Sequence, residues 1–170
     1  KALLFLSAGS VIHAMHHEQD MRKMGGLFKK IPFTGSMMWI GSLAIIGFPY
    51  FSGYYSKESI LENAYYSSSS MATFAYIVGI LTALLTAFYS WRLLFMTFHG
   101  KTRSDLKTYD HAHESPLVMA IPLILLAFGS IFAGILFSNF YIGKLQYAFW
   151  GDSIVLHDGK HHYLPFVQTL

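Results

Sequence analysis

The sequence predicts an all-α protein, a polytopic bundle of transmembrane helices with one discontinuous helix. Hydrophobic residues make up 54% of its 170 residues and charged residues only 12%, about half of the share that is usual in soluble proteins. Residues 31–56, 63–91 and 116–143 contain no Asp, Glu, Lys or Arg. Each stretch exceeds the roughly 20 residues that cross a bilayer. This composition excludes a disordered chain and a large soluble catalytic domain.

The first apolar segment is short and covers residues 1–15. We interpret it as the end of a membrane span, and we expect the first half of that span to precede Lys1. The second apolar region, residues 33–66, is instead too long for one straight span. A continuous helix of that length would extend about 51 Å, whereas the hydrocarbon core is about 30 Å thick.

An interruption near the middle of residues 33–66 resolves this excess of length. Gly47, Pro49 and Gly53 lie within seven residues of one another. Proline removes a hydrogen-bond donor and clashes with the preceding turn, and glycine tolerates unusual dihedral angles. We therefore predict a helix that is broken around these three residues. Broken helices at membrane depth mark ion sites in transporters.

Two further spans are predicted at residues 71–98 and 116–141, followed by a tail over residues 142–170. Small residues recur at helical spacing in both spans, which favours close helix packing in a larger bundle. They are Gly79, Ala83, Thr86 and Ser90 in the first, and Gly129, Ser130, Ala133 and Gly134 in the second.

The orientation follows from the basic residues of the connections. The first connection carries Arg22, Lys23, Lys29 and Lys30, and the third carries Lys101, Arg103 and Lys107, whereas residues 62–70 carry no Lys or Arg. We therefore expect the first and third connections to face the inside. The tail balances Lys144 and Lys160 against Asp152 and Asp158 and is expected on the outside.

The candidate functional residues are the ionisable groups within the spans. Lys57 and Glu58 directly follow the predicted break, and we expect them to begin the second half-helix, with Glu58 in its first turn. The pKa of lysine moves readily on burial, so Lys57 suits proton transfer. Lys1 precedes an apolar run and is the second candidate. The alternative for Lys57 is an amine that extends to the outer interface.

Other residues have structural explanations. His13, His16 and His17 have a spacing that could hold a metal, but no third ligand is defined, so interfacial histidines are the preferred interpretation, also for His111, His113, His157, His161 and His162. Arg92 follows Trp91 at the inner end of a span and is interpreted as an anchor. The basic residues form no continuous patch, so nucleic acid is excluded as a partner.

The chain has no cysteine, which excludes disulfides, thiolate metal sites and iron–sulfur ligation within it. No glycine-rich dinucleotide fingerprint is present either. We therefore expect no cofactor in this chain.

Four segments then show a resemblance. They are residues 1–6, 9–13, 17–27 and 53–58, with the sequences KALLFL, GSVIH, HEQDMRKMGGL and GYYSKE. Together they resemble the largest antiporter-like membrane subunit of respiratory complex I, the NADH:ubiquinone oxidoreductase chain 5 family. The resemblance extends to about residue 138.

This resemblance implies the carboxyl-side part of such a subunit, and proton translocation driven by quinone reduction elsewhere in the complex. It implies that Lys1 is the central lysine of the family's eleventh helix. Lys57 becomes the lysine of the broken twelfth helix, near the outer exit, and Glu58 stands where many members have aspartate.

The resemblance also implies the surroundings of the chain. Flavin, iron–sulfur clusters and quinone are expected in partner subunits, and the partners are the other membrane-arm subunits, the rest of the same subunit and membrane lipids. The mitochondrial inner membrane is the preferred location, with the bacterial plasma membrane as the alternative. The alternative functions are the large subunit of a multisubunit sodium/proton antiporter and a structural membrane fragment without proton transfer.

Overall fold

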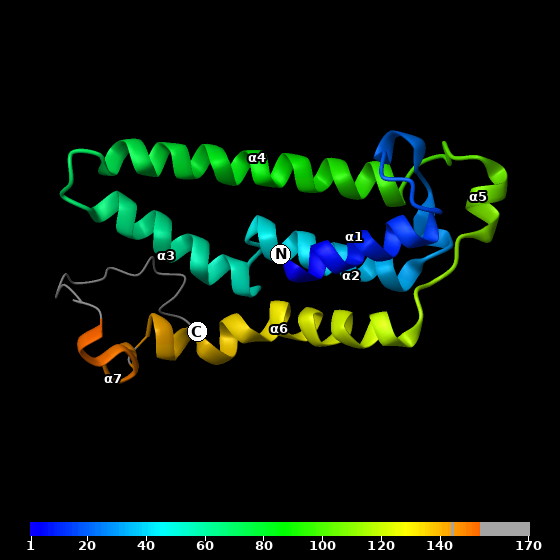
Figure 1. Cartoon of the computed structure of the whole chain (residues 1–170). Coiled ribbons are helices and arrows are strands. Elements are labelled where there is room, and N and C mark those ends of the chain that lie inside the picture. Colours follow the sequence, from blue (N-terminus) through cyan, green and yellow to red (C-terminus); the bar gives the residue numbers. More distant parts are fainter. Residues whose placement is uncertain (144, 154–170) are drawn as a thin grey trace. The chain divides into compact units, whose positions relative to one another are not determined.

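The computed structural model describes residues 1–143 and 145–153, and within that part of the chain every regular element is a helix. The chain divides into two compact units, Lys1–Phe137 and Ser138–Leu170. The first unit contains α1 (Ala2–Ala14), α2 (Pro32–Ile46), α3 (Ser52–Tyr66), α4 (Ala72–Phe98), α5 (Leu106–His111) and most of α6 (Leu117–Tyr141) (Figure 1). The predicted helical fold with a discontinuous helix is confirmed.

The helices of the first unit begin and end where the sequence favours it. Pro32 occupies the first position of α2, where its missing N–H costs no hydrogen bond. Glycine in the left-handed conformation ends the same helix at Gly47. Two short 3₁₀ helices, Met21–Lys23 and Leu27–Lys29, shape the connection between α1 and α2.

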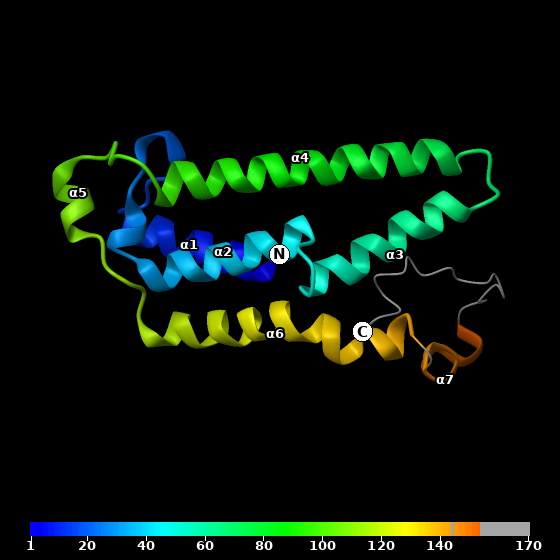
Figure 2. The same cartoon turned by 180° about the vertical axis from the view of Figure 1, so that it is seen from behind.

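Helix α2 packs against both α1 and α4, as seen from opposite sides in Figures 1 and 2. Gly41 permits the close approach to α1, because a Cβ there would lie 2.9 Å from the side chain of Leu4. Buried apolar side chains from all three helices and the adjoining loops form one cluster. Its members are Val11, Ala14, Met15, Met24, Leu27, Ile31, Met38, Leu94, Phe98 and Ala112.

Helices α4 and α6, with 27 and 25 residues, are long and apolar enough to cross a membrane. The predicted packing stripe of α4 is confirmed, since Thr86 and Ser90 are buried and a Cβ at Gly79 would overlap the side chain of Leu61 on α3. Of the two glycines in the predicted stripe of α6, only one packs against another helix. Gly134 lies against Tyr55 of α3, whereas nothing lies within 4 Å of a Cβ at Gly129.

The second unit contains the end of α6, the helix α7 (Gln146–Trp150) and a 3₁₀ turn, Gly151–Ser153. Tyr141 makes ring contacts with Phe149 and Trp150, and the Trp150 indole donates to the Tyr141 carbonyl at 3.2 Å. Several residues used in the sequence analysis lie outside the described residues. They are Lys144, His157, Asp158, Lys160, His161 and His162.

Candidate functional site

The second predicted span is interrupted over residues 47–51. Gly47 adopts a left-handed conformation with φ 88°, and the backbone N–H groups of Gly47 and Phe48 both donate to the carbonyl of Leu43. Tyr50 is also left-handed, at φ 71°, which is uncommon for an aromatic residue. Pro49 lies between them. These conformations turn the chain out of α2 and leave carbonyls of its last turn without helical partners.

Lys57 reaches back from α3 to one of these carbonyls. Its Nζ donates to the carbonyl oxygen of Ile46, the last residue of α2, at 3.2 Å. The side chain is half-buried, and its Cδ lies 3.3 Å from the position of a Cβ on Gly47. The carboxyl end of a helix carries partial negative charge, so a cationic side chain there is electrostatically favourable. A proton-carrying group is thus held directly at the interruption.

Gly53 brings the two half-helices together. A Cβ on Gly53 would overlap the carbonyl oxygen of Ala44, so only glycine fits where α3 crosses the end of α2. This contact also corrects the expected start of the second half-helix. Helix α3 begins at Ser52, so Gly53 and its contact with α2 already lie within the helix. Glu58 therefore lies beyond the first turn of α3, which contains no acidic residue.

The other predicted ionisable residues lie apart from this contact. Lys1 is exposed at the start of α1, and Figure 1 shows the N-terminus at the level of the break. Glu58 is half-buried on α3, and no ion pair joins it to Lys1 or Lys57 in the described part of the chain. Glu62, within the predicted broken span, lies on α3, and its buried Oε1 has no hydrogen-bond partner among the described residues.

The opposite end of α2 is held by a residue that the sequence analysis passed over. Oε1 of Glu114 accepts a hydrogen bond of 2.6 Å from the N–H of Phe33, and Oε2 accepts one of 2.7 Å from the hydroxyl of Thr34. The N–H of Thr34 also points at this carboxylate, at 3.3 Å from Oε1. In the sequence, Glu114 is recognisable only as a carboxylate residue in a polar connection, about 80 residues from Phe33 and Thr34.

The first and third connections, which carry the basic residues, also contact each other directly. Lys30 forms a 3.1 Å ion pair with Asp110, and Tyr109 donates to the carbonyl of Gly26. The guanidinium of Arg103 donates to the carbonyls of Met21, Arg22 and Met96. The first and third connections therefore form one structured cap, which we call the basic-loop end.

A local ion pair orders the first connection. The Arg22 guanidinium donates to both carboxylate oxygens of Asp20, at 2.8–3.1 Å. These hydrogen bonds, with one from the backbone N–H of Arg22, lower the pKa of Asp20 to about 2. A hydrogen bond from the backbone N–H of Asp20, followed by one from Lys23, lowers the pKa of Glu18.

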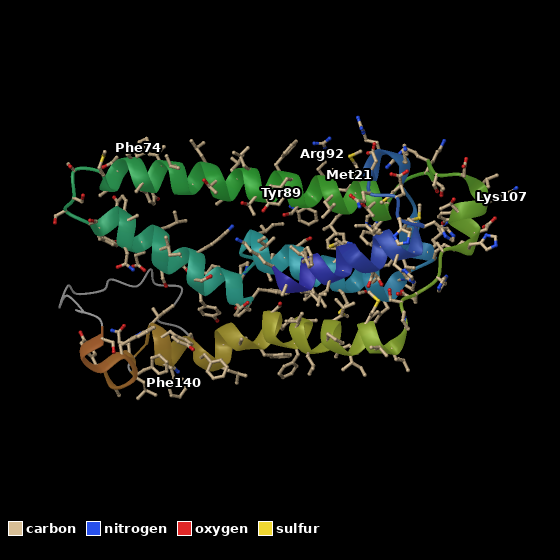
Figure 3. The ribbon with its side chains drawn as sticks, viewed as in Figure 1. Met21, Phe74, Tyr89, Arg92, Lys107 and Phe140 are labelled. Atoms are coloured by element: carbon tan, nitrogen blue, oxygen red, sulfur yellow. The ribbon has the colours of Figure 1, made fainter. Side chains whose placement is uncertain are left out.

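Among the described residues singled out in the sequence, the following side chains are exposed: His13, His16, His17, His111, His113 and Arg92. The imidazole of His13 makes edge contacts with those of His17 and His113, with centroids 6.5 and 6.4 Å apart. No group of three or more His, Asp or Glu side chains among the described residues is arranged to hold a metal ion. Arg92 projects from α4 on the side away from α1 and α2 (Figure 3).

Comparison with known proteins identifies the class to which this fold and site belong. Residues 1–86 match the family described as NADH:quinone oxidoreductase/Mrp antiporter, TM, so the chain belongs to this family of antiporter-like membrane proteins. Residues 89–150 match the family described as NADH dehydrogenase subunit 5 C-terminus. The resemblance seen in the sequence is confirmed.

Individual relatives carry a more specific name. The chain is similar to NADH-ubiquinone oxidoreductase chain 5 of Marchantia polymorpha, with 54% identity over 92% of this chain, and to NADH-quinone oxidoreductase subunit L of Rhodobacter capsulatus, with 51% identity over 92%. Chain 5 of Metridium senile is 56% identical over 80% of this chain. The matches span only 22–23% of these relatives' own lengths.

Proposed function

We propose that the chain forms the exit-side half of an antiporter-like proton channel in an NADH:quinone oxidoreductase. Lys57 relays protons at the helix break, Glu58 modulates it, and Lys1 passes protons toward it from the channel axis. The observation that carries the proposal is the hydrogen bond from Lys57 to the carbonyl of Ile46. It places a group that can gain and lose a proton where the backbone is opened.

In this proposal the chain holds no redox cofactor. Flavin, iron–sulfur clusters and quinone are bound by partner subunits, and quinone reduction there drives proton transfer here. The partners are the other membrane-arm subunits and the rest of the same antiporter-like subunit. The membrane is the mitochondrial inner membrane, with a bacterial plasma membrane as the alternative, and the relatives from Marchantia polymorpha and Rhodobacter capsulatus fit either location.

The test compares two substitutions of Lys57 in the assembled complex. Lys57→Ala removes the amine. Lys57→Arg keeps a cation that can hold the Ile46 carbonyl but does not release its proton in proteins. NADH-driven proton pumping and NADH:quinone turnover are measured in membranes, with assembly checked by native electrophoresis. Lys107→Ala, which removes an exposed lysine on α5, is the matched control (Figure 3).

We expect both Lys57 variants to lower pumping and turnover by about tenfold or more, because a positioned proton-transferring group contributes at least that much. The Lys107 variant retains both activities. If Lys57→Arg pumps at the wild-type rate, no proton passes through this side chain. If Lys57→Ala does so as well, the amine is an interfacial anchor and the segment's role is structural.

The second candidate function is a multisubunit sodium/proton antiporter, because the description of the matching family includes both kinds of protein. Flavin and iron–sulfur clusters that copurify with the chain would favour the respiratory complex. Sodium-dependent transport without those cofactors would favour the antiporter.

A further inference from the structure

Glu62 is an ionisable residue of α3 to which the proposed function gives no role. It lies four residues beyond Glu58 and five beyond Lys57, and its side chain is half-buried. Its Oε1 is buried, yet no hydrogen-bond donor reaches this oxygen within the described part of the chain. A carboxylate oxygen accepts hydrogen bonds, and a buried acceptor without a donor costs free energy. This oxygen therefore has a place for a proton, or for a donor that the described residues do not supply.

Glu62 belongs to a row of acidic and phenolic residues along α3. Residues four positions apart on a helix are neighbours on one face, with Cβ atoms about 5–6 Å apart. At this spacing the row runs from the first turn of α3 to its last residue and consists of Tyr54, Glu58, Glu62 and Tyr66. We call these four residues the acid stripe. It extends about 18 Å at 1.5 Å per residue, and each of its side chains ends in an oxygen that can gain and lose a proton.

The acid stripe joins the helix break to the far end of α3, where the chain turns into α4 (Figure 1). At the break, Lys57 lies on the helical turn between Tyr54 and Glu58. At the far end, Tyr66 is 63% exposed and is followed by four exposed serines, residues 67–70. That connection carries no Lys or Arg and is expected on the outside. The acid stripe therefore covers the distance that a proton has to cross after Lys57.

Neither helix packing nor a local ion pair accounts for a carboxylate at Glu62. The close contact between α3 and α4 is made by the neighbouring residue Leu61, which lies against Gly79. Residues 58–91 contain no Lys or Arg, so the outer part of α3 and the adjoining part of α4 offer no cation. A structural ion pair is therefore not available to Glu62 from these two segments.

The spacing permits a stepwise transfer of protons along the acid stripe. A proton can pass from the ammonium of Lys57 to the carboxylate of Glu58, which leaves a neutral amine and a carboxylic acid. The acid can then give the proton to the carboxylate of Glu62, one helical turn farther out. Glu62 can release it to water at the outer surface. Each step moves one proton and changes no other bond.

We propose that Glu62 is a further proton-transferring residue, which receives protons from Glu58 and releases them toward the outer side. The proton is held at Oε1, the buried oxygen that lacks a donor among the described residues. This inference rests on the proposed function, because it continues the proton route beyond Lys57.

The test replaces Glu62 in the assembled complex and measures NADH-driven proton pumping and the unfolding temperature. Glu62→Gln keeps the shape of the side chain but cannot carry the proton, whereas Glu62→Asp keeps a carboxylate. Asn63→Ala is the matched control, because Asn63 is exposed on the same turn and its amide donates to the carbonyl of Ser59 at 2.7 Å. We expect Glu62→Gln to lower pumping by about tenfold or more without lowering the unfolding temperature. Glu62→Asp should retain most of the pumping, and Asn63→Ala all of it.

Infrared difference spectroscopy gives a readout that a purely structural role would not change. A carboxylic acid that gains or loses its proton during turnover contributes a C=O stretching band that an amide does not give. We expect this band in the wild type and in Asn63→Ala, a displaced band in Glu62→Asp and none in Glu62→Gln. A spectrum of Glu62→Gln that equals that of the wild type would overturn the proposal.

Comparison with Lys57→Arg separates this inference from the proposed function. Loss of pumping in both Lys57→Arg and Glu62→Gln supports both. Wild-type pumping in Glu62→Gln, with a loss in Lys57→Arg, overturns the role of Glu62 alone. The reverse result overturns the relay at Lys57 and leaves Glu62 in a route that bypasses it. A Glu62→Gln complex that fails to assemble, or that loses stability in parallel with pumping, assigns the carboxylate a structural role and overturns the inference.

Discussion

The two ends of α2 are held by charged side chains of opposite sign, and the two contacts differ in strength. At the amino end, the carboxylate of Glu114 accepts from two backbone N–H groups and a hydroxyl. At the carboxyl end, Lys57 makes one 3.2 Å hydrogen bond to a carbonyl. Both charges complement the helix dipole, negative at the amino end and positive at the carboxyl end.

This difference indicates which end of α2 is held more firmly. Glu114 lies within the interlocked basic-loop end, where Arg103, Tyr109 and Lys30 add further hydrogen bonds between the two connections. Lys57 lies beside a glycine and an exposed, irregular segment, residues 48–50. The single hydrogen bond of Lys57 can be released without unfolding the helix, whereas release of Glu114 breaks the hydrogen bonds from three donors at once. Under the proposed function, the break is the end of α2 at which a change in the protonation of Lys57 would alter the structure.

The largest effect is expected at the crossing of the half-helices. Gly53→Ala places a Cβ on the carbonyl of Ala44, and because backbone rather than a flexible side chain must move, we expect a loss of about 3 kcal/mol or more. Recovery of assembled complex and its unfolding temperature measure this. Gly129→Ala is the control, since open space surrounds that glycine. Equal recovery of the two variants would show that the half-helices do not cross as described.

A smaller loss is expected at the clamped end. Glu114→Ala leaves the first N–H groups of α2 without their acceptor, and we expect a cost of about 2 kcal/mol, at the upper end for a helix cap. The unfolding temperature of the complex measures it. Asp105→Ala is the matched control, because Asp105 precedes α5 without making a side-chain capping bond. An equal effect of both substitutions would contradict the clamp.

The third prediction separates backbone strain from the Lys57 contact. Gly47→Ala forces alanine into a left-handed conformation, at a cost of about 1 kcal/mol, and adds a methyl group 3.3 Å from Cδ of Lys57. We expect reduced stability and reduced proton pumping. Gly100→Ala carries the same backbone strain at φ 80° but has open space around it, so it should lower stability alone. Unchanged pumping in Gly47→Ala would show that the position of Lys57 tolerates displacement.

The smallest effect concerns the exposed ion pair of the first connection. The pKa of Asp20 is about 2 in the folded chain, below the value of about 3.9 in an unfolded one. The pair therefore stabilises the loop above about pH 4, and this contribution is lost as the pH falls toward 2. Hydrogen exchange of residues 18–24 should differ between wild type and Asp20→Asn at pH 6 and converge near pH 2. Identical exchange at pH 6 would contradict the pairing.

Much of the fold could be predicted because it rests on properties that lie close together along the chain. The lengths of uncharged residues predicted helices that correspond to α2 with α3, to α4 and to α6, and Gly47 with Pro49 predicted where α2 ends. The start of α3 was placed too late, since Gly53 was read as part of the break. Gly53 instead lets α3 pass close to the backbone of Ala44 on α2, and no local sequence pattern reveals that contact.

The sequence by itself determined the membrane character, the helical class and the residues worth testing, because composition, uncharged length and the rarity of an ionisable residue in a span are properties of the chain alone. Only the tertiary structure decided what those residues touch. Lys57 meets the Ile46 carbonyl across the break, and Glu114 meets Thr34 across 80 residues. Such contacts depend on how the helices pack, and packing is set by side-chain shapes on all of them together.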